Sequence, residues 1–166
     1  IYEEMLESPN DAVLCLKQVL AFDAQNEGAL KELDKLFVQQ EMWHDLADNL
    51  SAQLGICETD EDQVALNLRL AELRETKLDE IGAAIEIYKD VLKIDPENSV
   101  AIDAMERIIS NPEFKRDVAE ILEPIYQEMA AWSKLVGVYQ IIADTEEEAS
   151  RKVELLHKIA NLYEAQ

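Results

Sequence analysis

Apolar residues recur every three or four positions along most of the chain, and short polar turns divide this pattern into segments. In the first segment Val13, Leu16 and Leu20 fall on one side, which is the period of an amphipathic α-helix. Turn and stop signals such as Asp95-Pro96 mark the ends of the segments. The pattern predicts an all-α fold without strands. The nine expected helices span roughly residues 10–22, 26–39, 42–56, 61–76, 80–93, 97–110, 113–129, 131–143 and 146–165, and residues 1–3 are expected to end a further helix.

The chain also resembles itself at two offsets. An offset of 72 aligns residues 1–37 with 73–109, and an offset of 89 aligns 43–75 with 132–164, both without a gap. Identical pairs include Leu6/Leu78, Ala12/Ala84, Lys17/Lys89, Val19/Val91, Asp23/Asp95 and Asn26/Asn98 at the first offset, and Trp43/Trp132, Leu46/Leu135, Val64/Val153, Ala71/Ala160 and Leu73/Leu162 at the second. Such self-similarity predicts stacked repeats that bury their apolar faces against neighbours.

The two offsets differ by 17 residues, which is about one helix with its turn. The additional segment lies between about 112 and 129, with Pro112 expected in the first turn of a helix and Pro124 in its interior. An odd helix exchanges the inner and outer rows of a solenoid unless a kink at Pro124 absorbs the change. Both arrangements are compatible with the sequence.

One helix pair carries a familiar spacing. Ala84, Tyr88, Val91 and Pro96 follow one another at intervals of 4, 3 and 5 residues, after a Leu70-Ala71 pair. This resembles the tetratricopeptide repeat, and the similarity extends over nearly the whole chain, as in long bacterial proteins rich in such repeats. The resemblance implies a right-handed superhelix of antiparallel helix pairs and a role in protein–protein interaction. It also implies that Ala84, Tyr88 and Val91 are buried, and likewise Ala12, Leu16 and Val19 at the matching positions.

Residues 1–166 are therefore expected to form a single repeat domain. Because the chain opens with Ile1 and begins and ends at the same phase of the repeat, it is expected to be a piece of a longer array. Each end is then expected to expose an apolar face, which predicts self-association through those faces.

Acidic residues dominate the charge: 36 Asp and Glu against 15 Lys and Arg give a net charge of −21. Such a chain repels nucleic acid and anionic membrane surfaces, and no apolar run approaches the ~18 residues of a membrane span. The charge favours either a basic partner or simple solubility. Cys15 and Cys57 form no CxxC pair and lie on apolar registers, so we expect small buried residues without a disulfide, in a reducing cytoplasm.

No residue pattern predicts catalysis, a metal or a cofactor. His44 is expected at the surface and His157 partly buried, and neither has a nucleophile at a recognisable spacing. The acidic runs 60–62 and 146–148 lack the alternating pattern of a calcium loop and sit where helices begin, which favours helix capping. The chain is therefore not expected to be an enzyme.

The leading interpretation is a scaffold that binds a protein or peptide, with a preference for basic segments. Tetratricopeptide domains that bind a carboxylate use Lys, Arg and Asn on the first helix of each pair, whereas this chain has acids there. The candidate partner-binding residues are Glu72, Glu75, Asp103 and Glu106. The recurring Trp43 and Trp132 are either packing residues or exposed contacts. The alternative function is a spacer that holds other domains apart and binds nothing.

Overall fold

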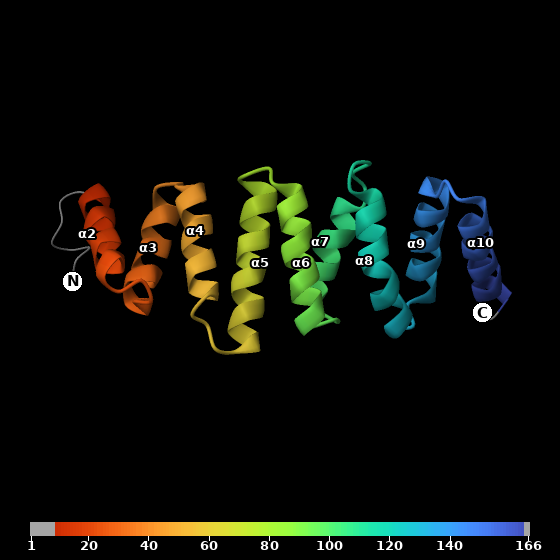
Figure 1. Cartoon of the computed structure of the whole chain (residues 1–166), viewed down its shortest axis with the longest axis horizontal. Coiled ribbons are helices and arrows are strands. Elements are labelled where there is room, and N and C mark those ends of the chain that lie inside the picture. The colour runs from red at the N-terminus through yellow and green to blue at the C-terminus, as the bar shows by residue number, and fades with distance from the viewer. Residues whose placement is uncertain (1–8, 165–166) are drawn as a thin grey trace. The chain divides into compact units, whose positions relative to one another are not determined.

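The computed structural model describes residues 9–164, and this range contains nine α-helices and no strand (Figure 1). The predicted all-α fold is confirmed, while the expected helix end at residues 1–3 lies outside the described residues. The helices are α2 (Pro9–Phe22), α3 (Glu27–Gln39), α4 (Trp43–Leu54), α5 (Asp60–Thr76), α6 (Ile81–Ile94), α7 (Ser99–Ile108), α8 (Lys115–Glu128), α9 (Trp132–Thr145) and α10 (Ala149–Glu164).

Contacts divide the chain into two compact units, Ile1–Ala84 and Ile85–Gln166, with the boundary inside α6. In the first unit α3 packs against both α2 and α4, and α5 packs against α4. In the second unit α8 packs against both α7 and α9, and α10 packs against α9. Within each unit, helices thus pack against their neighbours in sequence, as expected for helical repeats.

The core of each unit is built from the predicted apolar stripes. Leu30 and Leu50 are almost completely buried in the first unit, and Leu122 and Ile142 in the second. Burying one such side chain contributes about 1.5–3 kcal/mol. The stripes therefore account for the packing of consecutive helices.

The offset of 72 corresponds to a repeated turn. Asn26 precedes α3 and its side-chain oxygen accepts a hydrogen bond from the backbone of Ala29 at 3.0 Å, while Asn98 does the same before α7 at 3.1 Å. The amide groups of these two asparagines also donate to the carboxylates of Asp23 and Asp95. Because capping asparagines satisfy the free N–H groups of a helix start, the same local chemistry ends one helix and begins the next in both places.

The offset of 89 corresponds to a different repeated turn, at the ends of α3 and α8. Glu41 and Ala130 both adopt the left-handed backbone conformation, with φ of 55° and 52°. In each turn the next N–H donates to the carbonyl five residues earlier, at 2.8 Å after α3 and 2.9 Å after α8. This is the Schellman arrangement for ending a helix, here formed without glycine.

The segment that lengthens the second offset is α8. Pro124 lies inside it, as predicted. The helix begins at Lys115, however, so the prediction that Pro112 occupies its first turn is wrong. The reason is local: the side chain of Asn111 accepts a hydrogen bond from the backbone of Glu113 at 3.1 Å, which holds these residues in a turn.

Burial follows the predicted repeat closely in α6 and less closely in α2. Ala84, Tyr88 and Val91 are buried, as predicted. At the matching positions Ala12 is buried and Leu16 is half-buried, but Val19 is exposed, so the prediction for that residue is wrong. Val19 lies on the side of α2 that packing against α3 leaves open.

The same open side of α2 explains why one of the two cysteines is exposed. Cys15 lies one turn before Val19 and is exposed, while Cys57 is half-buried. The prediction of a buried residue is therefore wrong for Cys15. Both thiols are free.

Candidate interaction surface

The four predicted binding residues lie on two helices in different units. Glu72 and Glu75 belong to α5, where Glu72 is exposed and Glu75 is half-buried. Asp103 and Glu106 belong to α7, where Asp103 is exposed and Glu106 is half-buried. Each unit therefore carries one of the two pairs.

Glu106 is engaged inside the second unit. Its carboxylate accepts a hydrogen bond from the Tyr126 hydroxyl at 2.6 Å and forms an ion pair with Lys134. Burial alone acts to raise the pKa of Glu106, but the bonds from Lys134 and Tyr126 outweigh it and hold the pKa below its ordinary value. Burial, followed by the bond to Glu106, raises the pKa of Tyr126. Glu106 thus connects α7 to α8 and α9, which makes it less available to a partner than Asp103.

Glu72 borders a small hollow of about 180 Å³ between α4 and α5. Two of the residues that line this hollow contact each other: the Nζ atom of Lys77 lies 5.0 Å from the centre of the Trp43 ring. Such a contact between a cation and an aromatic face is stabilising. The residues that line the hollow are Trp43, Leu46, Leu50, Arg69, Glu72, Leu73, Thr76 and Lys77.

Arg69 is held by neighbouring residues of the first unit. Two of its N–H groups donate to the two carboxylate oxygens of Asp34 at 2.9 and 2.8 Å, and the Gln53 amide donates to the same carboxylate at 3.2 Å. The hydrogen bonds to Asp34 raise the pKa of the Arg69 guanidinium above its ordinary value. This network joins α3, α4 and α5, so most of the hydrogen-bonding capacity of Arg69 is used within the unit.

A larger hollow of about 310 Å³ lies in the second unit, between the turn from α6 to α7 and the end of α8. Its lining consists of Asp95, Pro96, Glu97, Ile125, Glu128 and Met129. The lining therefore combines three acidic residues with three apolar ones, and no basic residue is among them. The sequence did not predict this hollow, because Asp95-Pro96 was interpreted as a stop signal and as part of the repeat spacing, while Glu128 is distant in sequence.

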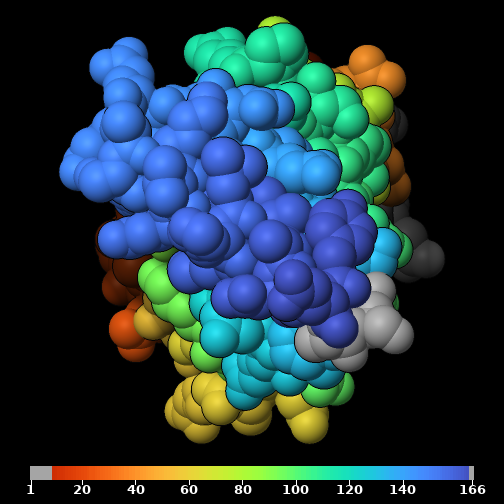
Figure 2. Space-filling model, turned by 90° about the vertical axis from the view of Figure 1, so that its right-hand side faces the viewer, coloured from red at the N-terminus to blue at the C-terminus, as the bar shows by residue number. Residues whose placement is uncertain are grey.

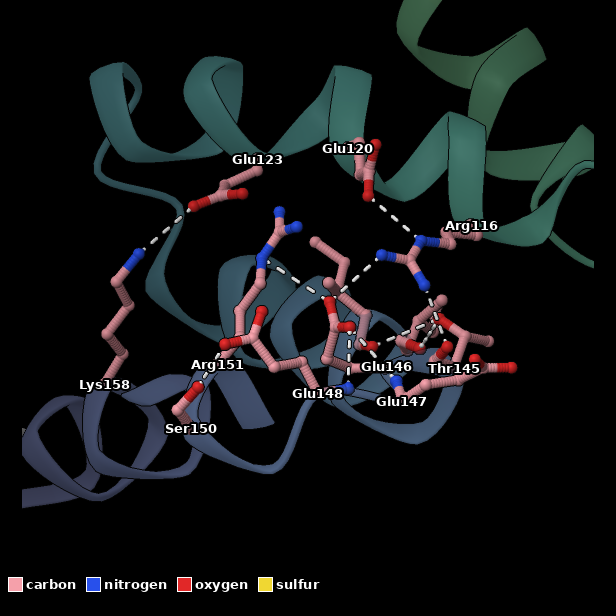
Figure 3. Close-up of polar contacts among 12 residues, drawn as sticks. Arg116, Glu120, Glu123, Thr145, Glu146, Glu147, Glu148, Ser150, Arg151 and Lys158 are labelled. Atoms are coloured by element: carbon pink, nitrogen blue, oxygen red, sulfur yellow. Dashed lines mark hydrogen bonds and ion pairs between the residues drawn. The ribbon is translucent and has the colours of Figure 1, made fainter. Parts of the chain in front are cut away.

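The acidic runs lie where α5 and α10 begin, as predicted, but only the second run supplies a capping carboxylate. At α5 the cap is Thr59, whose hydroxyl accepts a hydrogen bond from the backbone of Asp62 at 3.1 Å, while residues 60–62 occupy the first turn. Glu146 accepts hydrogen bonds from the backbones of Glu147 and Glu148 at 3.0 and 3.2 Å (Figure 3). Residues 9–164 contain no group of three or more His, Cys, Asp and Glu side chains that could hold a metal ion.

Two arginines complete the surroundings of Glu146. Arg116 donates to its carboxylate at 3.0 Å and to the Thr145 carbonyl at 2.8 Å, and Arg151 approaches the same carboxylate at 3.4 Å (Figure 3). The backbone N–H of Glu148, together with the two arginines, lowers the pKa of Glu146. The cluster therefore connects α8 with the turn before α10.

The histidines and tryptophans differ in surroundings. His44 is exposed, as predicted, whereas the prediction that His157 is partly buried is wrong, because it lies on a side of α10 that packing against α9 leaves open. Trp43 is half-buried under Lys77, while its counterpart Trp132 is 40% exposed. Recurrence in the sequence therefore does not give the two tryptophans the same environment.

Neither the models of known protein families nor the curated proteins include a match to this chain. Among residues 9–164, every helix is too short or too polar to cross a membrane.

Proposed function

We propose that this chain is a non-catalytic interaction scaffold of the tetratricopeptide type, a right-handed superhelix of antiparallel helix pairs that binds protein segments rich in Lys and Arg. The repeated turns at both offsets support the repeat assignment, since the same capping bonds and the same left-handed residues recur at fixed spacing. Stacked repeats commonly present extended binding surfaces.

The observation that carries the preference for basic partners is the distribution of charge. Most of the 15 basic residues form ion pairs with carboxylates of the same chain, so the acidic excess of the net −21 charge remains available at the surface. An acidic surface of this kind steers and holds basic partners. The paired basic residues are Lys17, Lys31, Lys35, Arg69, Arg74, Lys89, Lys93, Arg116, Lys134, Arg151 and Lys158.

The hollow next to Asp95, Glu97 and Glu128 is the preferred place for such a contact. A Lys or Arg side chain can lay its aliphatic stem on Ile125 and Met129 while its charged end meets the carboxylates. Glu72 and Asp103 supply further negative charge on the exposed helix surfaces of their own units, and the half-buried Glu75 lies one turn after Glu72. The proposal thus combines a shaped contact with a general electrostatic attraction.

Fluorescence anisotropy with a labelled Lys/Arg-rich peptide tests this function, with a peptide carrying Gln at the basic positions as the reference. We expect binding of the basic peptide only, weakening as salt is raised. The double variant Glu97→Gln/Glu128→Gln should bind about fivefold more weakly, because an exposed ion pair contributes up to ~1 kcal/mol. The control Asp48→Asn/Glu58→Gln changes the same charge at exposed positions of the first unit, neither of which lines the hollow.

Charge reversal at Glu72 and Glu75 is a second test, expected to weaken binding without unfolding the chain. Equal binding of both peptides, or equal loss in the hollow variant and its control, would contradict the proposed contact. Absence of any binding would favour the spacer function, for which the small volume of the α4–α5 hollow is the supporting observation.

A further inference from the structure

The hollow between α4 and α5 combines an apolar lining with two cations. Leu46, Leu50 and Leu73 supply buried apolar side chains, while Arg69 and Lys77 are exposed to solvent. Its volume of about 180 Å³ is below the roughly 300–1,000 Å³ of most ligand pockets, but it is close to the ~150 Å³ of a cavity that holds benzene. The hollow therefore has the size of one aromatic ring.

The second unit repeats this arrangement with a larger side chain at one position. Three of the lining residues, a tryptophan and two leucines, recur unchanged at the offset of 89. Leu50, however, corresponds to Tyr139, and Arg69 corresponds to Lys158. Helices α9 and α10 pack against each other as α4 and α5 do, with α10 at the front of Figure 2. The two helix pairs can therefore be compared position by position.

The ring of Tyr139 lies beside the counterpart of Arg69. Tyr139 is buried, and the Nζ atom of Lys158 lies 5.0 Å from the centre of its ring. A cation over an aromatic face in this way is stabilising. In the first unit Leu50 has no ring to offer, and Arg69 lines an open hollow instead. The second unit thus supplies from its own chain the aromatic side chain for which the first unit has space.

We infer that the α4–α5 hollow binds an aromatic side chain of a partner protein, in the place that Tyr139 fills in the second unit. Arg69 can stack on the ring while it donates to Asp34, because the face of a guanidinium is free when its N–H edge is engaged. Trp43 and Lys77 add an aromatic contact and a second cation. Aromatic side chains seated in pockets are frequent anchors of protein interfaces.

This site goes beyond the proposed preference for basic segments and is independent of it. The acidic hollow lies in the second unit and attracts charge, whereas the α4–α5 hollow lies in the first unit and accepts a neutral ring. Binding of an uncharged peptide should therefore change little with salt, while binding of a basic peptide weakens. The salt response distinguishes the failure of one proposal from the failure of the other.

The experiment is two-dimensional NMR of the ¹⁵N-labelled chain, titrated with the blocked neutral peptide Gly-Ser-Tyr-Ser-Gly. The reference peptide carries Leu in place of Tyr. The indole N–H signal of Trp43 should shift as the tyrosine peptide is added, while the signal of Trp132 in the second unit stays unchanged. The tyrosine peptide should bind about two- to fivefold more tightly than the leucine peptide, the ratio expected from an exposed contact between a cation and a ring.

Leu50→Tyr fills the hollow from within, as Tyr139 does in the second unit, so it should abolish binding and leave the chain folded. Ala65→Tyr is the matched control, because it adds the same side chain at an exposed position of α5 that does not line the hollow. It should bind like the wild type. Lys77→Gln should weaken binding of the tyrosine peptide about twofold by removing one cation. Lys31→Gln, at an exposed lysine of α3, is its control.

An unshifted Trp43 signal, or a Leu50 variant that still binds the tyrosine peptide, would overturn the inference. Equal binding of the two peptides, or a preference for the leucine peptide, would do the same, because the site would not then select a ring. A Leu50 variant that fails to fold would also contradict the inference, since the space would not accept a tyrosine.

Discussion

The segments α3–α5 and α8–α10 have the same helix-ending turn and an ion pair at the same place, but differ in chemistry. Asp34 and Arg69 are related to Glu123 and Lys158 by the offset of 89. In the first unit the guanidinium donates to both carboxylate oxygens, while in the second the ammonium lies 3.5 Å from a single oxygen. A two-point contact fixes geometry more strongly than a point charge does.

The interiors differ further. Asn49 is buried and its amide donates to the carbonyl of Leu30 at 2.9 Å, and Gln53 is buried beside Asp34. Val138 and Ile142 occupy the matching positions in the second unit and are buried without polar partners. The repeated backbone therefore accepts either a satisfied polar network or apolar packing at the same positions.

The additional helix explains a second difference. At the offset of 72 Asp34 corresponds to Glu106 on α7, and at the offset of 89 it corresponds to Glu123 on α8. One acid of the first unit thus has two counterparts in the second, each paired with a lysine, Lys134 and Lys158. The chain retains an acid at this position while its partners change.

The largest expected loss of stability is at Asp34, in the first of the two ion pairs. Asp34→Ala should lower the free energy of unfolding by about 2–3 kcal/mol, because it leaves the buried Gln53 amide and the Arg69 guanidinium without their acceptor. Glu123→Ala should cost under ~1 kcal/mol, since its lysine partner is largely exposed. Urea denaturation measures the free energy of unfolding of both variants. Equal losses would show that the two ion pairs stabilise the chain to the same extent and would contradict the comparison.

A substitution at Ala84 tests the close packing expected of α6. Ala84→Leu should destabilise the chain by about 1–3 kcal/mol, because the site is completely buried and has no room for a larger side chain. Ala65→Leu on the exposed side of α5 is the control and should leave the melting temperature nearly unchanged. An unchanged melting temperature for the Ala84 variant would contradict close packing there.

The shared turn predicts equal, smaller effects in the two segments. Glu41→Gly and Ala130→Gly should each raise the free energy of unfolding by about 1 kcal/mol, because glycine removes the cost of the left-handed conformation. Ala52→Gly within α4 should have the opposite sign, since glycine weakens a helix interior. Effects of different sign at the two turns would show that the turns are not equivalent.

The smallest effect concerns acid stability. Because the pKa of Glu106 is lowered on folding, its contribution is present above about pH 4.5, its ordinary value, and is lost as the pH falls through the lower value in the folded chain. Glu106→Gln should remove this acid-dependent loss, by less than ~1 kcal/mol because the side chain is partly solvated. Urea denaturation across the acid range checks this, with Asp103→Asn as the exposed control. If the stability of the Glu106 variant falls with pH as much as that of the wild type, Glu106 does not contribute to acid-dependent stability.

Local sequence determined much of this fold. Apolar spacing sets where the helices lie, and the capping asparagines set where α3 and α7 begin, because these signals act within a few residues. The two offsets were likewise visible in the sequence, and both reappear as repeated turns. The start of α8 was misplaced because a side-chain bond of Asn111 competes with the helix signal of Pro112.

Tertiary structure decided which side chains are exposed to solvent. Val19 and Val91 are identical residues in similar helices, and His157 follows an apolar pattern, yet exposure depends on which helix lies over each face. The same holds for the predicted acids: Glu106 is occupied by residues of α8 and α9, while the hollow of Asp95, Glu97 and Glu128 joins positions more than 30 residues apart. Helix periodicity is a property of one segment, whereas burial and charge pairing belong to contacts between segments, and only the folded chain brings those together.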